Sequence, residues 1–139
     1  MVSISKVLSD NDAGATGSHQ AGILVPKNPR VLGFFPPLDR ARRNPRAVLR
    51  LTDDSGREWQ FTFIYYNNAL FGGTRNEYRL THMTEFIRRH NLKKDDEVIF
   101  RREEDGPFRL SFQRRNSPQF SETGVLKLRA GWRVLSFQG

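Results

Sequence analysis

A short row of alternating charges in the middle of the chain has the residue types that read the bases of duplex DNA. In the segment FGGTRNEYRLT at 71–81, Arg75, Glu77 and Arg79 recur at every second position. If this segment is extended, the three side chains project to one side of it. Arginine matches the O6/N7 edge of guanine, and a carboxylate accepts from cytosine N4. Cross-strand salt bridges on a solvated sheet edge would have the same spacing, so spacing alone leaves both interpretations open.

A second segment, LSDNDAGATGSHQ at 8–20, is small, polar and glycine-containing. A stretch this free of bulky groups lets backbone N–H groups approach an anion closely, as phosphate-binding loops do. No Gly-Lys-Ser/Thr follows it, so it is not a nucleotide-binding loop. An ordinary surface loop would have a similar composition.

The elements that must position these segments are mainly strands. Runs at 47–52 and 58–66 flank a turn-rich break at 53–56, which predicts a hairpin. A second hairpin is expected from Glu97 through a turn at Asp105-Gly106 to Phe112. In the first hairpin the expected buried face carries Trp59, Phe61, Phe63 and Tyr65.

The remaining elements are a late strand and two short helices. Alternation over 126–134 predicts a strand that bends at Gly131. The spacing of Met83, Phe86, Ile87 and His90 predicts a helix, and either Thr81 or Thr84 could cap its N-terminus. A weaker helix is expected near 30–35. Many short strands with one or two helices predict an open β-barrel with helices at its ends.

Composition narrows the possible partners. The chain has 139 residues, enough for one domain, and its net charge is +8 with 18 Arg and five Lys among 23 basic residues. That excess favours nucleic acid or an acidic membrane surface as a partner, although the codon usage of a GC-rich genome would also produce many Arg. No Cys is present, which removes disulfides and thiol chemistry. No apolar run is long enough to cross a membrane and no secretory signal is visible, so we expect a cytoplasmic protein.

The two unusual segments together resemble the N-terminal effector domain of the EcoRII-type restriction endonucleases. The matching text is LSDNDAGATGSHQAG at 8–22 and IYYNNALFGGTRNEYRLT at 64–81. The stretch FIRRHNLKKDDEVIF at 86–100 is similar to the helix–loop–strand of plant transcription-factor DNA-binding pseudobarrels. The resemblance implies a mainly β, seven-stranded open pseudobarrel with one or two short helices at its ends. Its two arms, 8–20 and 71–81, would grip the major groove of double-stranded DNA.

The resemblance also implies site residues. The family carries basic residues where this chain has Gly73 and Tyr78, which puts phosphate contacts there in doubt. Base-reading roles carry over to His19, Arg75, Asn76, Glu77 and Arg79. Backbone or arm roles carry over to Thr16, Gly17, Ser18, Gln20, Gly73, Thr74 and Tyr78.

No catalytic site is visible in the chain. Restriction nucleases need clustered carboxylates with a Lys to hold Mg²⁺ and activate water, and no such cluster stands out. His19, His82 and His90 lack metal-ligand spacing. We therefore expect no catalytic residue, metal or cofactor here, and Mg²⁺ only in a separate nuclease domain.

The expected function is sequence-specific recognition of duplex DNA. The single domain, 1–139, would be the effector or specificity part of a two-site, type IIE-like restriction endonuclease of a bacterium or archaeon. CCWGG or a similar short G/C-rich site follows from the resemblance. A stand-alone transcription-factor-like domain, non-specific or single-stranded binding through an aromatic platform, and nucleic-acid cleavage by this chain alone are the alternatives.

Overall fold

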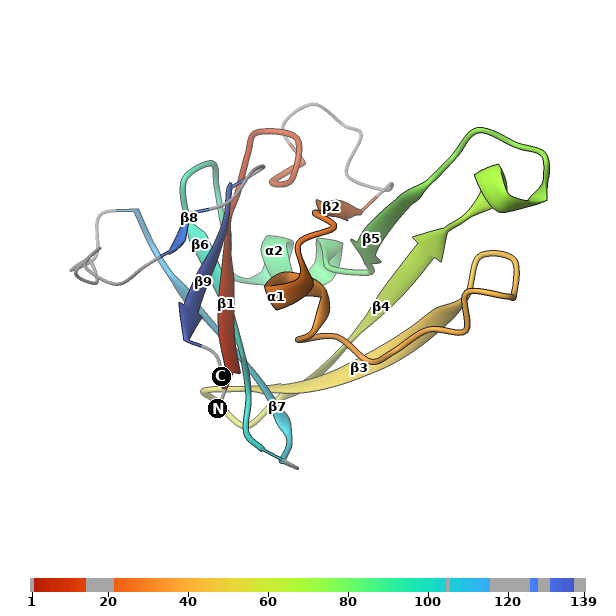
Figure 1. Ribbon diagram of the computed structural model, residues 1–139. Helices are drawn as coiled ribbons and strands as arrows, with labels where there is room; N and C mark the ends of the chain where they lie inside the picture. The colour runs from red at the N-terminus through yellow and green to blue at the C-terminus, as the bar shows by residue number, and fades with distance from the viewer. Residues whose placement is uncertain (1, 15–21, 105, 116–125, 128–130, 137–139) are drawn as a thin grey trace.

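Short strands dominate the part of the chain that the computed structural model describes, which is residues 2–14, 22–104, 106–115, 126–127 and 131–136. Figure 1 shows them as one strongly curled sheet. The strands are β1 (Val2–Val7), β2 (Ile23–Val25), β3 (Arg46–Asp53), β4 (Glu58–Tyr66), β5 (Glu77–Thr81), β6 (Glu97–Arg102), β7 (Phe108–Gln113), β8 (Leu126–Lys127) and β9 (Trp132–Ser136). The helical segments are α1 (Pro29–Leu32), the 3-10 helix η2 (Asn68–Phe71) and α2 (Thr84–Arg89).

The strand order across the sheet is β2-β5-β4-β3-β7-β6-β1-β9-β8. Each neighbouring pair runs antiparallel except β3 and β7, which are parallel over Leu51–Asp53 and Phe108–Leu110. The sheet thus has two halves that join at this short parallel contact. The half β2-β5-β4-β3 carries the charged row of the sequence.

The hairpin β3–β4 confirms the first predicted pair of strands. Alternate residues of β4 point into the core, where Trp59, Phe61, Phe63 and Tyr65 are each at most 6% exposed. The Asp53 carboxylate holds the turn: it accepts from the Ser55 and Arg57 amides and from the Trp59 indole N–H at 2.8 Å. The period-two pattern therefore predicted both the strand and its buried face.

The end of the chain differs from the predicted single bent strand. β8 and β9 are two short antiparallel strands, with Leu126 opposite Val134. Gly131 has φ +81°, and a Cβ there would lie 2.7 Å from the Val7 carbonyl oxygen. A left-handed glycine packed this closely against β1 permits a reversal that a bulge within one strand would not give. Trp132, directly after it, is fully buried.

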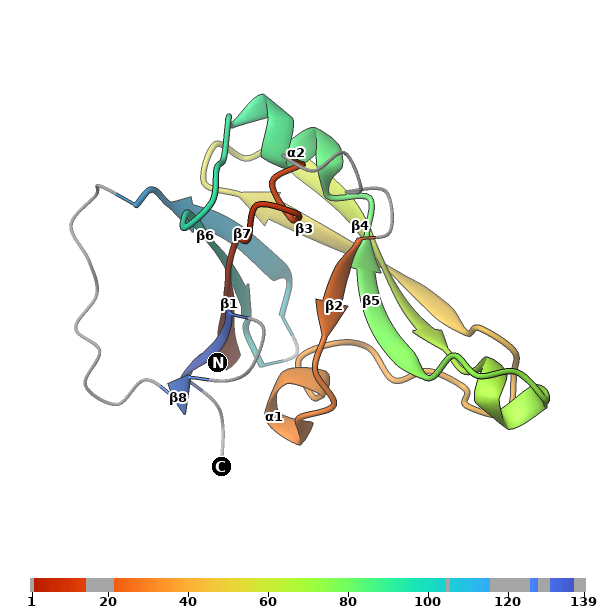
Figure 2. The same cartoon turned by 90° about the horizontal axis from the view of Figure 1, so that it is seen from above.

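The helices lie at opposite ends of the curled sheet, as Figure 2 shows for α1 and α2. Asn28 caps α1 by accepting from the Arg30 amide at 2.9 Å, and Pro29 begins the helix. In α2 the N-cap is Met83, without a side-chain cap, so neither threonine expected there fills that role. The α2 residues Phe86 and Ile87 are buried, and Phe86 packs edge-on against Trp59.

These features confirm the predicted mainly β pseudobarrel with short helices at its ends. The described residues contain nine strands where seven were expected. The sequence pattern gave no sign of β1, which pairs with both β6 and β9, and β8 is only two residues long. No helix among the described residues is long and apolar enough to span a membrane.

Candidate nucleic-acid interface

The loop between β4 and β5 projects from the barrel as an ordered arm, seen in Figures 1 and 2. Helix η2 forms the tip of the arm. The Ala69 amide donates to the Arg75 carbonyl at 2.9 Å and so closes this tip. Gly72 ends η2 with φ +90°. Leu70 and Phe71 at this tip are 58% and 42% exposed. Hydrogen bonds within the arm thus define its shape.

The charged row lies along the strand that leaves this arm. Arg75 donates from Nε to Glu77 Oε1 at 2.7 Å, and Arg79 donates from Nε to Glu77 Oε2 at 3.1 Å. One carboxylate therefore joins two guanidinium groups, which confirms that the three side chains share one side of the strand. These ion pairs join residues of one segment and do not cross between strands, so the cross-strand interpretation does not describe them. The row is partly exposed, which is compatible with base reading.

Glu77 is held in its charged form. Burial alone would raise the pKa of this carboxyl, but the hydrogen bond from Arg75 and the charge of Arg79 outweigh burial, so the pKa lies below its usual value. An ionised carboxylate only accepts hydrogen bonds. At neutral pH the row consequently presents donor, acceptor and donor in a fixed order.

The two arginines of the row differ in availability. The Arg75 side chain is 41% exposed, and its guanidinium lies 3.7 Å above the Tyr66 ring. The Arg79 side chain is 21% exposed and also donates from Nη1 to the Gly22 carbonyl at 3.2 Å. Arg75 is therefore the more accessible of the two to an incoming base, whereas Arg79 also binds the backbone just before β2.

The structure does not bring Asn76 and Tyr78 together with this row. Asn76 Oδ1 accepts from the Tyr65 hydroxyl at 2.7 Å. Tyr78 lies opposite Tyr65 in the strand pairing, and their rings stack at 4.2 Å. Burial raises the pKa of the Tyr78 phenol. Tyr78 thus lies on the face of β5 that continues the aromatic core through Phe63, and Asn76, just before β5, bonds to the same tyrosine pair through Tyr65.

Gly73 and Thr74, two of the expected arm contacts, lie near the tip of the arm, and both are exposed. A Cβ on Gly73 would lie only 2.8 Å from the Asn68 Cβ. The Gly73 amide also bonds the Asn68 carbonyl at 2.8 Å. This arm conformation excludes a side chain where the related family has a basic residue, and Thr74 follows it as an exposed position.

Only the first part of the N-terminal arm belongs to the described residues. The buried Lys6 ammonium lies 2.9 Å from the Asp12 carboxylate, which also accepts from the Ser9 amide. Leu8 is 1% exposed and exchanges two backbone hydrogen bonds with 95–96. The expected contacts Thr16, Gly17, Ser18, His19 and Gln20 lie outside the described residues.

Tyr66 and Asn67 are two site residues that sequence reasoning missed. Tyr66 pairs with Glu77, so its ring lies under the charged row and supports Arg75. Asn67 is fully buried and holds the segment before β3 through hydrogen bonds to 40–44. The strand register reveals the first role. The second had no sequence signal, since an Asn after a strand usually indicates only a turn.

Of the two other histidines, His90 packs against the scaffold and His82 is exposed. His90 lies against the Phe86 and Phe112 rings at 4.8 and 4.7 Å, and burial lowers its pKa. His82 Nδ1 lies 2.9 Å from the Thr81 hydroxyl. In the described part of the chain, no three His, Asp or Glu side chains gather in a group that could hold a metal ion.

Comparisons with known proteins agree with this architecture. Residues 1–97, which contain both arms, match the family model of the N-terminal part of restriction endonuclease EcoRII. Over 83 residues, 58% of this chain, the sequence is 40% identical to the type II restriction enzyme EcoRII of Escherichia coli. Over 109 residues, 78% of this chain, it is 34% identical to auxin response factor 2 of Oryza sativa subsp. japonica.

The chain is much shorter than these relatives. It spans 20% of the length of the Escherichia coli enzyme and 14% of that of the rice protein. Among solved structures, the Arabidopsis FUS3-DNA complex superimposes with a TM-score of 0.61 at 19% identity. The match covers 79% of this chain and 94% of that chain, which shows that the fold is shared.

Proposed function

This chain belongs to the family of N-terminal domains of EcoRII-type restriction endonucleases, and from that premise we propose that it binds double-stranded DNA by sequence through the major groove. The arm between β4 and β5 enters the groove and places Arg75, Glu77 and Arg79 against base edges. The N-terminal arm, whose family counterpart of His19 contacts DNA, approaches from the other side. Phosphates are held by exposed arginines around the two arms.

The observation that carries this proposal is the carboxylate placed between two guanidinium groups. A strip that only clamps phosphates gains nothing from Glu77, because a carboxylate repels the DNA backbone. A base-reading strip uses it, because cytosine N4 needs an acceptor beside the donors that guanine needs. The two ion pairs fix the spacing of the row in advance, so less conformational entropy is lost on binding.

We further propose that the domain is the effector part of a two-site, type IIE-like restriction endonuclease. In that arrangement it binds one copy of the recognition site and thereby licenses cleavage by a Mg²⁺-dependent nuclease domain elsewhere in the parent protein. The domain itself cuts nothing. CCWGG is the leading candidate site, because the family resemblance supplies it and the Arg-Glu-Arg row suits G/C pairs.

A selection of bound duplexes from a random pool tests the proposal. The expected result is a short G/C-rich consensus that the Arg75→Ala variant recognises with a relaxed preference at one base pair and with about 1–3 kcal/mol less affinity. Equal loss on selected and scrambled duplexes would reduce Arg75 to a phosphate contact. Incubation of the chain with supercoiled plasmid and Mg²⁺ tests for cleavage, which we expect to be absent.

A stand-alone DNA-binding domain is the second candidate. The likeness to the plant proteins, 31–34% identical over 109 residues for four auxin response factors, favours it, because these relatives are not named as nucleases. Both candidates predict a duplex consensus. They separate on whether adding the selected duplex in trans stimulates DNA cleavage by the full-length parent protein.

A further inference from the structure

We propose that Arg46 and Arg50 on β3 bind backbone phosphates of the same duplex, along the flank of the groove that the β5 row reads. This inference rests on the proposed function and extends it to a strand that neither the sequence motifs nor the arms include. It gives the domain a third contact segment besides its two arms. The contact chemistry is arginine to non-bridging phosphate oxygen.

Strand register places Arg46 on the same face as the charged row. Arg46 lies opposite Ile64 of β4, and Ile64 lies opposite Arg79 of β5. Residues directly opposite one another in antiparallel strands project from the same face of the sheet. Arg50 lies four residues further along β3 and is opposite Gln60. Since side-chain direction alternates along a strand, Arg50 shares that face too.

The spacing fits the dimensions of DNA. Two strand separations put β3 about 10 Å from β5 in the plane of the sheet. The major groove is about 12 Å wide, so a strand this far from a base-reading strand lies at the flank, where the phosphates run. Four residues along β3 separate the two arginines by about 13 Å, which lets them contact separate phosphates.

Both guanidinium groups are available to a ligand. Arg46 and Arg50 are exposed, and neither is paired with a carboxylate among the residues that the structure describes. Arg46 donates from Nε to the Asn44 carbonyl at 3.4 Å. In the β5 row, by contrast, one Glu partly neutralises two Arg. The phosphate attraction that the row lacks is therefore present two strands away.

Asn67 fixes this strand relative to the arm. Its Nδ2 donates to the Arg42 carbonyl at 2.6 Å, and its Oδ1 accepts from the Asn44 amide at 2.7 Å. The Tyr65 amide bonds the Pro45 carbonyl at 3.0 Å. The segment that enters β3 thus lies against the base of the arm, and Figures 1 and 2 both show the two side by side. A fixed spacing lets both strands engage one duplex at once.

The test compares arginine variants at several salt concentrations. Fluorescence anisotropy gives the affinity of the wild type, R46Q, R50Q and R46Q/R50Q for the selected and for a scrambled duplex. We expect the log–log salt dependence to become shallower by about 0.9 for each arginine removed, because each phosphate contact releases counterions. The ratio of selected to scrambled affinity should not change. R46K/R50K should retain the wild-type slope.

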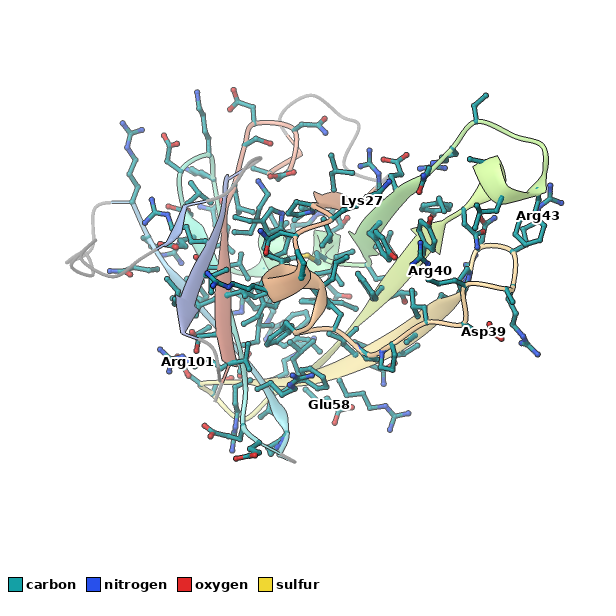
Figure 3. The ribbon with its side chains drawn as sticks, in the orientation of Figure 1. Lys27, Asp39, Arg40, Arg43, Glu58 and Arg101 are labelled. Carbon is teal, nitrogen blue, oxygen red and sulfur yellow. The ribbon has the colours of Figure 1, made fainter. Side chains whose placement is uncertain are left out.

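Arg101→Gln is the matched control, because Arg101 is also an exposed arginine. Figure 3 shows it on the other side of the molecule from Arg40 and Arg43, which lie near the arm. Thermal melting confirms that each variant is folded. The inference is overturned if R46Q/R50Q keeps the wild-type salt slope, because the arginines would then only prevent pairing of an open strand edge with another chain. It is also overturned if R46Q/R50Q loses base preference, because the arginines would then read bases. A wild type without any duplex consensus contradicts the proposed function itself.

Discussion

Arg79 on β5 donates a hydrogen bond to the carbonyl of Gly22, the residue at which the described part of the chain resumes after 15–21. Gly22 has φ +78°, and a Cβ there would lie 2.6 Å from the Leu80 carbonyl. This close approach brings Gly22, two residues after the expected N-terminal arm at 8–20, directly against the strand that carries Arg79. Arg79 therefore links the charged row to the backbone that leads into β2.

Arg79→Lys should separate this contact from charge. Lysine keeps the positive charge but cannot bond Glu77 and the Gly22 carbonyl through a planar fork. We expect about tenfold weaker binding to the selected duplex, since hydrogen bonds of charged groups contribute about 1.5–3 kcal/mol. Binding to a scrambled duplex should stay unchanged. Anisotropy titrations at one salt concentration measure both, and an equal loss on the two duplexes would contradict the assigned role.

Glu77→Gln should weaken discrimination while strengthening general DNA binding. The amide removes a negative charge that repels phosphates, and it presents an N–H group where cytosine N4 needs an acceptor. We expect the affinity for scrambled duplex to rise and the preference for the selected site to fall. A new selection from the random pool should show the altered base position directly.

Glu85→Gln is the control for this change. Glu85 lies on α2 with a 77% exposed side chain and a long ion pair to Arg57 at 3.9 Å. Its removal alters net charge by the same amount without touching the row. If both variants shift scrambled-duplex affinity equally and neither alters the consensus, Glu77 has no base-reading role.

Gly73→Arg should fail to restore the basic contact that the resemblance places there. The new Cβ would meet the Asn68 Cβ at 2.8 Å, so the arm must shift before the guanidinium can reach DNA. We expect weaker binding to the selected duplex in spite of the added charge. The double variant N68G/G73R removes the 2.8 Å contact, although the backbone carbonyl oxygen of residue 68 stays at 3.2 Å, so it should recover part of the affinity. Stronger binding by G73R alone would show that the arm yields easily.

Asp53→Asn should change how stability depends on acid. Burial raises the pKa of this carboxyl, but hydrogen bonds from Ser55, Trp59 and the Arg57 backbone outweigh it and set the pKa at about 2, from 3.8. The folded-state pKa is depressed, so this stabilisation is complete above about pH 5 and is lost as pH falls toward 2. It amounts to about 2 kcal/mol.

Urea unfolding of the wild type and D53N between pH 7 and pH 2 measures this effect. The free-energy advantage of the wild type over D53N should shrink by about 2 kcal/mol across the acid range. A constant difference between the two proteins at every pH would show that Asp53 titrates alike when folded and unfolded.

The sequence by itself determined the elements whose pattern is local. Period-two alternation predicted β4 and its buried aromatic face, because one side of a half-buried strand must be apolar. The same alternation put Arg75, Glu77 and Arg79 on one side of their strand, as their ion pairs confirm. The resemblance supplied the pseudobarrel and the two arms. Base contacts by individual residues stay predictions.

Only the tertiary structure decided which residues from distant segments meet. The pairing of β1 with β6 and β9, the Asn67 contacts with the segment before β3, and the alignment of Arg46 with Arg79 all depend on strand register. Register is set by how a whole sheet buries its apolar face, and no short stretch of sequence encodes that. The tertiary structure likewise separated Asn76 and Tyr78 from the row, because successive strand residues face opposite sides and the aromatic core stacks on Tyr78.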